Sequence, residues 1–538
     1  MKYLRTLSKS FCVAFISSVA AVNAAHAVGL LKVKSPVKDR YIVVMNKDAA
    51  NTMGISSRAD FAISARDFSA KYGAQVATTY THALAGFVIE ASESQALAIS
   101  QDSNIEYVIE DSIVSVSASQ NASSWGLDRI DQRGTELDEI YNYDFDGKGV
   151  NAYIIDTGIR ASHNDFEGRV SLDYSVVNDG RGADDCNGHG THVAGTVGGK
   201  YWGVAKAVDL HSVRVFGCNG KGYTSDVIAG VDWVTSHASL PAVANMSLGG
   251  ESNRALDDAV NNSINSGVVY VVAAGNDNID ACKESPARLS AAITVGAVDF
   301  DGKRASFSNY GRCVDLFAPG EDIPSAYFRG DSSIEVLSGT SMAAPHVSGI
   351  VALYLQNHQK ASPVAVSNAL QAVTTYGVIG NKGSESPNLL AYSRYTATNR
   401  SALFRYYNGS VKDHFYTRSW SELQGGTPSG WKLESVEGYI NGTQLSGTKP
   451  LYRYYNTKSG DHFYTVNWSE LGGGSGNYKY EGITGYVPGA ASAETKSLYR
   501  YFNTSSGDHF YTTNWNELGG GTGSWRYEGV ACQVYKSL

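Results

Sequence analysis

Three short segments of the sequence carry side chains that together can turn a serine into a nucleophile. Asp156 ends an apolar run, His189 lies in a glycine-rich segment, and Ser341 follows Gly-Thr. A serine hydroxyl is a poor nucleophile near neutral pH, so an imidazole must take its proton and a carboxylate must orient that imidazole. Taken singly, the segments also read as a turn, a structural histidine and a helix cap. Their combination favours acyl transfer.

Acyl transfer also requires donors for the negative charge that develops on the substrate carbonyl oxygen. The side-chain amide of Asn276, in an Ala-Ala-Gly-Asn segment, is one candidate. The backbone N–H of Ser341 is the second, because it is expected at the start of a helix.

The elements around these residues predict an α/β fold. Short apolar runs alternate with helical patterns, which indicates a parallel sheet covered by helices on both faces. The runs are 152–155, 208–215, 243–246, 268–273 and 292–295. Active sites of such sheets lie outside the carboxyl ends of the strands, where Asp156 is expected.

With these motifs in the order Asp, His, Ser, residues 120–395 resemble a catalytic domain of the subtilisin family (subtilases), in its proteinase K-like branch. The resemblance implies an endopeptidase of broad specificity that needs no catalytic cofactor. It implies that Asp156 is the orienting acid, His189 the general base, Ser341 the nucleophile and Asn276 the oxyanion donor. It gives no catalytic role to His192 or His346.

The same resemblance implies a cleft that binds substrate as an added strand. Its two walls would be Gly220, Gly222 and Tyr223 on one side, and Ser247, Leu248, Gly249 and Gly250 on the other. Glycines let a peptide backbone approach closely, and strand addition tolerates many side chains. Each glycine run taken alone is equally compatible with a plain turn.

Calcium is expected as a structural ion, on two sets of residues that resemble ligands in the family. The first set is Asp128, Asp131, Gln132 and Asp138, with Ile140 where some relatives have a polar residue. The second is Asp315, after Ser-Phe-Ser-Asn. Hard oxygen ligands suit calcium, but an acidic solvated surface explains the first set as well.

The N-terminus predicts export. Residues 1–27 read as a secretory signal peptide, with a basic start, a short apolar stretch and Ala25-His26-Ala27 as the cleavage site. A membrane anchor is the alternative, but the apolar stretch is too short to span a bilayer. Residues 28–119 form a small α+β unit that resembles the inhibitor-type propeptide of the family. We place its cut at Ser119–Gln120.

Export to an oxidising compartment makes disulfides the default for the cysteines. Cys12 leaves with the signal peptide, which leaves an odd number. The resemblance implies the pairs Cys186–Cys218 and Cys282–Cys313. The sequence alone allows other pairings, and Cys532 is left free or pairs between molecules.

After a linker at 396–401, residues 402–538 repeat three times with a period of about 47 residues. Each repeat has Leu-(Phe/Tyr)-Arg-Tyr-(Tyr/Phe)-Asn, then Asp-His-Phe-Tyr-Thr, a tryptophan and Glu-Leu. We expect a closed threefold β domain. Its aromatic residues either form the core or bind sugars and insoluble material, and a purely stabilising or export-related role is the alternative.

The formal net charge of -8 argues against nucleic acid as a partner. We expect a secreted, extracellular monomer whose partners are protein or peptide substrates and its own propeptide. Two other functions stay in competition. A serine esterase would use another motif order and Gly-x-Ser-x-Gly, and a binding protein with a dead protease domain would have no reason to keep the triad and Asn276.

Overall fold

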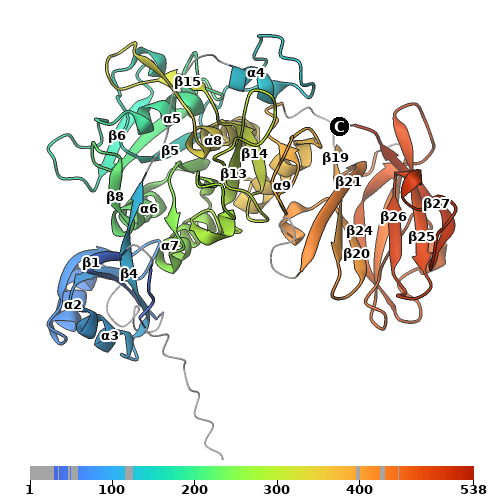
Figure 1. Cartoon of the computed structure of the whole chain (residues 1–538), viewed down its shortest axis with the longest axis horizontal. Helices are drawn as coiled ribbons and strands as arrows, with labels where there is room; N and C mark the ends of the chain where they lie inside the picture. Colours follow the sequence, from blue (N-terminus) through green and yellow to red (C-terminus); the bar gives the residue numbers. More distant parts are fainter. Residues whose placement is uncertain are drawn as a thin grey trace, which may run out of the picture.

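The computed structural model describes residues 30–33, 36–46, 49, 58–115, 125–394, 400–423, 430–445 and 447–537. The predicted signal peptide, the predicted cut and most of the predicted linker lie outside these ranges. Three bodies lie in a row, with the large central body between a small N-terminal unit and a C-terminal β domain (Figure 1). No helix in the described ranges is both long and apolar enough to cross a membrane.

The N-terminal unit is the α+β unit that the sequence predicts. Its strands are β1 (Pro36–Met45), β2 (Gln75–Tyr80), β3 (Gly86–Glu90) and β4 (Ile105–Ser115), in the order β2-β3-β1-β4. Helices α2 (Arg58–Ala70) and α3 (Glu93–Ser100) accompany them. A capping box formed by Ser92 and Gln95 begins α3, because the side chains satisfy N–H groups that the helix leaves unpaired.

The central body contains the predicted parallel sheet. Its nine strands run in the order β17-β18-β14-β13-β11-β9-β5-β7-β6. Within it, β6, β7, β5, β9, β11, β13 and β14 pair in parallel. Their bounds are β5 (Asn151–Asp156), β6 (Val170–Ser175), β7 (Asp209–Arg214), β9 (Ala242–Met246), β11 (Val269–Ala273), β13 (Ile293–Val298), β14 (Leu316–Pro319), β17 (Thr375–Tyr376) and β18 (Leu389–Leu390).

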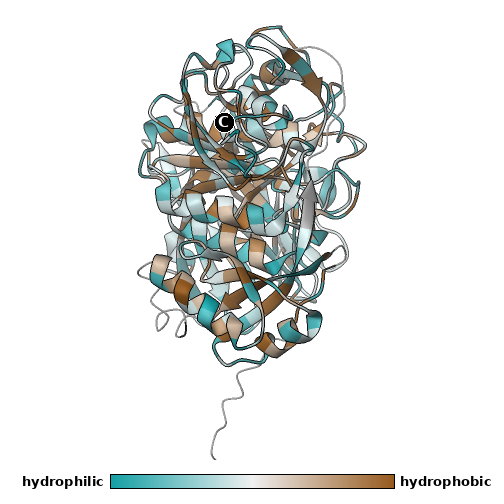
Figure 2. Ribbon diagram, turned by 90° about the vertical axis from the view of Figure 1, so that its left-hand side faces the viewer, coloured by the Kyte–Doolittle hydropathy of each residue, from teal (hydrophilic) through white to brown (hydrophobic). Residues whose placement is uncertain are grey.

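Helices cover both faces of this sheet, so its apolar side chains divide between two core clusters. The helices are α4 (Trp125–Asp131), α5 (His189–Gly198), α6 (Thr224–His237), α7 (Arg254–Asn265), α8 (Thr340–Asn357) and α9 (Pro363–Val373). The helices that face the viewer in Figure 2 carry both hydrophobic and hydrophilic residues. Short strands complete the body: β8 (Lys221–Tyr223), β10 (Gly250–Glu251), β12 (Glu284–Ser285), β15 (Ile323–Ala326) and β16 (Ile334–Leu337).

The C-terminal domain contains one long–short–long strand unit per repeat. The units are β19 (Arg400–Asn408), β20 (Asp413–Thr417) and β21 (Trp431–Asn441); β22 (Thr448–Asn456), β23 (His462–Thr465) and β24 (Tyr478–Pro488); and β25 (Thr495–Asn503), β26 (His509–Thr512) and β27 (Trp525–Tyr535). Strand β19 therefore begins inside the predicted linker.

The repeated Asp-His pairs join one repeat to the next. His462 Nδ1 lies 2.6 Å from Asp413 Oδ2, His509 Nδ1 2.7 Å from Asp461 Oδ2, and His414 Nδ1 2.7 Å from Asp508 Oδ2. The first of these contacts joins repeat 2 to repeat 1, and the last joins repeat 1 to repeat 3, so the ring closes. These pairs are almost wholly buried and serve as joints between repeats.

The first repeat packs against the central body. Its Phe404 and Trp420 belong to the same buried cluster as the strands of the central sheet. Asn368 on α9 exchanges two hydrogen bonds with Ser421, at 2.8 and 3.0 Å. The two bodies therefore share part of one hydrophobic core.

Candidate active site

Asp156 and His189 meet at the carboxyl end of the parallel sheet, as the motifs predict. Asp156 ends β5 with its side chain fully buried, and His189 begins α5. His189 Nδ1 lies 2.8 Å from Asp156 Oδ1 and 3.0 Å from Oδ2. The backbone N–H of Thr157 donates to the same carboxylate at 2.7 Å. The carboxylate therefore fixes Nδ1 as the protonated nitrogen, which leaves Nε2 to accept a proton.

The loop before His189 is fastened at several points. Asp185 accepts hydrogen bonds from the backbone N–H of Asn187 and Gly188, at 2.9 and 3.0 Å, and from Thr191. It also accepts one from the Thr157 hydroxyl at 3.0 Å. Sequence reasoning did not single out Asp185, since an aspartate beside a cysteine has no distinctive pattern.

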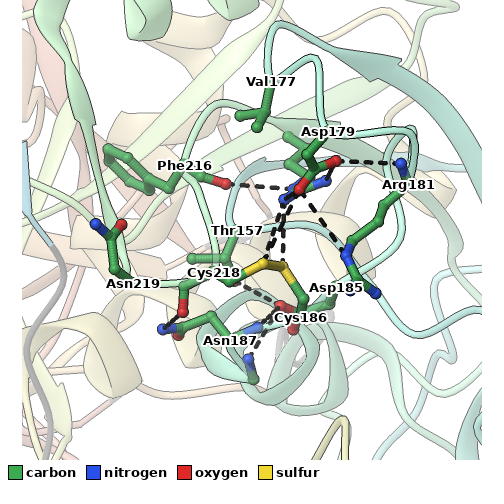
Figure 3. The surroundings of a disulfide bond; sticks show 12 residues. Thr157, Val177, Asp179, Arg181, Asp185, Cys186, Asn187, Phe216, Cys218 and Asn219 are labelled. Carbon is green, nitrogen blue, oxygen red and sulfur yellow. Dashed lines mark hydrogen bonds and ion pairs between the residues drawn. A yellow bond between two sulfur atoms is a disulfide. The ribbon is translucent and has the colours of Figure 1, made fainter.

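A disulfide ties this loop to one wall of the predicted cleft. Cys186 is bonded to Cys218, and Figure 3 shows the bond between the loop of Asp185 and Asn187 and the chain that leads to Asn219. Cys282 is bonded to Cys313, and Cys532 is a buried free thiol. Asp179 also lies near the sulfurs, but a disulfide has no thiolate to offer a metal.

Ser341 lies in the first turn of α8 and faces the other predicted wall. Its hydroxyl donates to the carbonyl oxygen of Ser247 at 3.1 Å, and the Ser247 hydroxyl donates to the carbonyl of Ser341 at 2.7 Å. His189 Nε2 is buried and makes no hydrogen bond within the described residues. Ser341 and His189 are therefore not hydrogen-bonded to each other in this structure. Catalytic hydrogen bonds often tighten only when substrate binds.

The side chain of Asn276 is held in place through its amide oxygen. Its Oδ1 accepts from the backbone N–H of Thr340 at 2.8 Å and from the Thr340 hydroxyl at 3.0 Å. This contact turns the amide nitrogen away from Thr340. Thr340, whose hydroxyl also accepts from Gly275 N at 3.1 Å, is a positioning residue that the motifs did not reveal.

The predicted cleft walls lie at the ends of different elements. Gly222 and Tyr223 belong to β8, and Gly220 precedes it with a positive φ of 68°. Strand β4 of the N-terminal unit pairs antiparallel with β8, and Val114 lies opposite Gly222. This wall is thus an edge that accepts an extended segment. On the other wall, Leu248 is buried in the core and Gly250 begins β10, while Gly249 lies between them.

The first predicted calcium set brings carboxyl groups together. The backbone N–H groups of Asp138 and Glu139 donate to the Asp128 carboxylate at 3.3 and 2.6 Å. Asp131 Oδ1 is buried without a hydrogen-bond partner in the described residues, and burial raises its pKa, with Asp128 and Asp138 adding to the effect. An unpaired buried carboxylate oxygen beside other carboxylates fits a hard cation. The Gln132 amide donates to Glu136 O at 2.6 Å.

Asp315 lies in a different environment. Its Oδ2 accepts from Thr294 N at 2.8 Å and its Oδ1 from the indole Nε1 of Trp420 at 3.0 Å. Burial raises the pKa of Asp315 to about 7. Each oxygen of the carboxylate thus accepts one N–H donor, and one of these donors comes from the C-terminal domain. The role of Asp315 as a calcium ligand stays a prediction.

Two further histidines near the site are structural. His192 Nε2 bonds to Ile323 O at 2.9 Å, and burial lowers its pKa to about 3. His346 Nδ1 bonds to Met342 O at 2.8 Å, and burial lowers its pKa to about 4. Both rings stay neutral at ordinary pH and hold backbone carbonyls.

Comparison with known proteins agrees with this geometry. Residues 147–393 match the subtilase family, Peptidase S8; residues 40–117 match the peptidase inhibitor I9 family; and residues 402–535 match a domain of unknown function, DUF5648. The chain belongs to the subtilase family of serine peptidases.

Several secreted or serine-peptidase relatives are similar over much of their length. The extracellular serine proteinase of Thermus sp. (strain Rt41A) is 54% identical over 60% of this chain and 79% of its own length. Alkaline serine exoprotease A of Vibrio alginolyticus is 46% identical over 66% and 68%. The cuticle-degrading serine protease of Arthrobotrys oligospora is 36% identical over 71% and 95%. The crystal structure of a cold adapted subtilisin-like serine proteinase is 50% identical and covers 52% of this chain and 100% of that one, with a TM-score of 0.49.

Proposed function

We propose that this subtilase hydrolyses peptide bonds through Asp156, His189 and Ser341, with Asn276 as an oxyanion donor. The observation that carries the proposal is the short contact of the buried Asp156 carboxylate with His189 Nδ1, at 2.8 Å. Ser341 attacks the substrate carbonyl while His189 Nε2 takes its proton and then returns it to the leaving amine. Water then attacks the acyl-enzyme. His189 Nε2 takes a proton from this water and gives it to the Ser341 oxygen as the acyl group leaves.

We further propose that the chain is made as a zymogen and processed by its own site. Strand β4 pairs with β8 at a predicted substrate wall, so the propeptide already uses the edge that a substrate needs. The body of the propeptide lies on helices α6 and α7: Asp111 Oδ1 accepts from Ser225 N at 3.0 Å, and Asn262 donates to Ala83 O. Residues 116–124, which contain the predicted cut, lie outside the described ranges.

Ser341→Ala tests both statements. The variant should fold but remain an uncut precursor, because removal of the propeptide in cis requires the nucleophile. For subtilisin, loss of the serine costs about 2 × 10⁶ in kcat. Gel mobility and N-terminal sequencing of the purified chains give the result, with Ser338→Ala in the same segment as a control that should be processed normally. Normal processing of purified Ser341→Ala would remove Ser341 from the mechanism.

We propose a structural calcium ion at Asp128, Asp131 and Asp138. The support is the unpartnered buried Oδ1 of Asp131 next to two further carboxyl groups. An ion bound to the folded state and not to the unfolded chain would stabilise the fold, and it takes no part in the reaction.

For the C-terminal domain we propose binding to insoluble polymers. Trp468 and Trp515 are 44% and 42% exposed. Trp468 lies against Tyr452 and Tyr480, with ring centroids 4.9 and 5.3 Å apart, and Trp515 has the same arrangement with Tyr499 and Tyr527. Exposed aromatic faces of this kind can stack on sugar rings or on fibrous protein.

We also propose that the protein is secreted to the extracellular space.

A further inference from the structure

A buried carboxyl group lies between the two segments that flank Ser341. Glu284 is 9% exposed, and its strand β12 pairs with β10 directly after the wall at 247–250. A Cβ atom on Gly275 would lie 2.1 Å from Glu284 Oε2, and one on Gly249 would lie 3.7 Å from it. The carboxyl group therefore fills space that these two glycines leave open, beside Asn276 on one side and the cleft wall on the other.

A second carboxyl group continues this acidic region toward solvent. Asp277 follows Asn276 directly, is exposed, and makes a side-chain hydrogen bond with Glu284. Asn309 fixes the segment from below: its Oδ1 accepts from Asp277 N at 3.1 Å, and its Nδ2 donates to Ala274 O at 2.9 Å and to Glu284 Oε2 at 3.1 Å. Asp277 is thus the exposed member of this acidic pair, and Glu284 is the buried member.

No cation neutralises this pair within the described part of the chain. Neither Asp277 nor Glu284 forms an ion pair there, and the nearby Arg288 guanidinium is bonded to Asp257 at 2.6 Å. Burial and the neighbouring Asp277 raise the pKa of Glu284 to about 8. A buried carboxylate that no cation neutralises is costly in its charged form, and acids with shifted pKa values cluster at functional sites.

We infer that Glu284 and Asp277 bind the positively charged side chain of the substrate residue just before the scissile bond, lysine or arginine. This inference rests on the proposed function. The attacked carbonyl must lie between Ser341 and Asn276, and Ser341 bonds to Ser247 on the wall. We place the side chain of that residue between the wall and the segment at 274–277, where the two carboxyl groups lie.

The physical consequence is a preference by charge. A lysine or arginine side chain supplies the missing partner for the acidic pair, a leucine leaves the pair desolvated and unpaired, and a glutamate is repelled. Sites with buried polar groups discriminate strongly against ligands that leave those groups unpaired. This preference is narrower than the broad specificity that the family resemblance implies.

The test compares four peptides that differ in the residue before the cut: lysine, arginine, leucine or glutamate. Processed wild-type enzyme, Glu284→Gln and the charge-matched control Asp301→Asn, at an exposed turn, are assayed for kcat/KM. At pH 9, the wild type and control should prefer lysine and arginine over leucine by at least about tenfold. Glu284→Gln, which keeps the bond to Asn309, should lose about tenfold or more on lysine and change little on leucine.

Two results would overturn the inference. One is a wild type that cleaves the leucine peptide as well as the lysine peptide. The other is a Glu284→Gln variant whose kcat/KM falls equally on all peptides, which would make Glu284 a support for the Asn276 segment. A processed wild type that cleaves no peptide at all would instead contradict the proposed function.

Discussion

At the scale of single residues, the site depends on groups that hold the reactive atoms in place. Thr340 binds the oxygen of the Asn276 amide, and Asp185 binds the loop that carries His189. Neither touches the reacting atoms. Because each contact is a hydrogen bond inside a largely buried site, losing it leaves a polar group unsatisfied.

Asn276→Leu should lower kcat with little change in KM if Asn276 has the proposed role, because an oxyanion donor bonds mainly to the transition state. Removal of the corresponding amide in subtilisin lowers kcat by about 10²–10³, and we expect a similar loss. Steady-state kinetics, normalised by active-site titration, measure it. A change confined to KM would show that Asn276 acts on substrate binding alone.

The preference for lysine over leucine should rise with pH. Burial and Asp277 raise the pKa of Glu284 to about 8, so its carboxyl is neutral at pH 6 and mostly ionised at pH 9. Substrate lysine stays charged throughout this range. Glu284 also accepts a hydrogen bond from the neutral Asn309, and Glu251 lies opposite it in the backbone register of the strand pair.

The ratio of kcat/KM for the two peptides is the measurement, because a pH effect on the shared catalytic steps acts equally on both peptides and cancels. The ratio should increase severalfold between pH 6 and pH 9 in the wild type and less in Glu284→Gln. A flat ratio in the wild type would contradict the assignment of the charge to Glu284.

At the scale of elements, one short helical turn joins two bodies. Trp420 begins the turn Trp420–Glu422, is 2% exposed, and donates its indole N–H to the buried Asp315. Trp468 and Trp515 occupy the same place in the other repeats and are exposed. In the first repeat, the tryptophan at this position is therefore buried against the catalytic body and is not exposed.

Trp420→Phe should destabilise the catalytic body, because Asp315 loses a donor while it stays buried. A buried polar group left unsatisfied costs about 1–3 kcal/mol. Trp468→Phe is the matched control and should behave like the wild type. Half-lives of peptidase activity at elevated temperature compare the variants, and equal half-lives for both would show that the Trp420 contact contributes nothing measurable.

At the scale of the whole molecule, the catalytic body is held from two sides. The propeptide contacts helices α6 and α7 and the cleft wall at β8, whereas the first repeat contacts α9 and the buried cluster around the central sheet. Of these two sets of contacts, only that of the propeptide includes the predicted substrate wall. Removal of the propeptide should thus open the site, and removal of the repeats should leave the site open while exposing apolar side chains.

A chain that ends near Tyr395 should cleave a small soluble peptide at a rate close to that of the processed full-length enzyme at room temperature. All residues of the proposed mechanism lie between Asp156 and Ser341. The truncated form should lose activity sooner on heating, because the catalytic body loses the packing of Phe404 and Trp420. It should also be retained less on insoluble polymers. Equal retention on a panel of chitin, cell wall and fibrous protein would contradict polymer binding by the repeats.

Local sequence was sufficient for what depends on residue type and order. The chain order of Asp156, His189 and Ser341 predicted the chemistry, and the alternating apolar runs predicted the parallel sheet that brings Asp156 and His189 within 2.8 Å. The threefold period predicted the closed β domain, because each repeat must bury its apolar face against its neighbours.

Long-range contacts decided the rest. Trp420, Trp468 and Trp515 have near-identical local sequences, yet one is buried on Asp315 and two are exposed, since the neighbour that differs lies about a hundred residues away in the chain. The Asp-His pairs recur in the sequence without indicating their partners, and they become joints between repeats only when the ring closes. In the sequence, Glu284 has no feature that distinguishes it from other charged residues. Its place beside the cleft wall follows only from the pairing of β12 with β10. Burial depends on the tertiary structure. The sequence alone therefore does not predict which of these groups are buried or how their charges act.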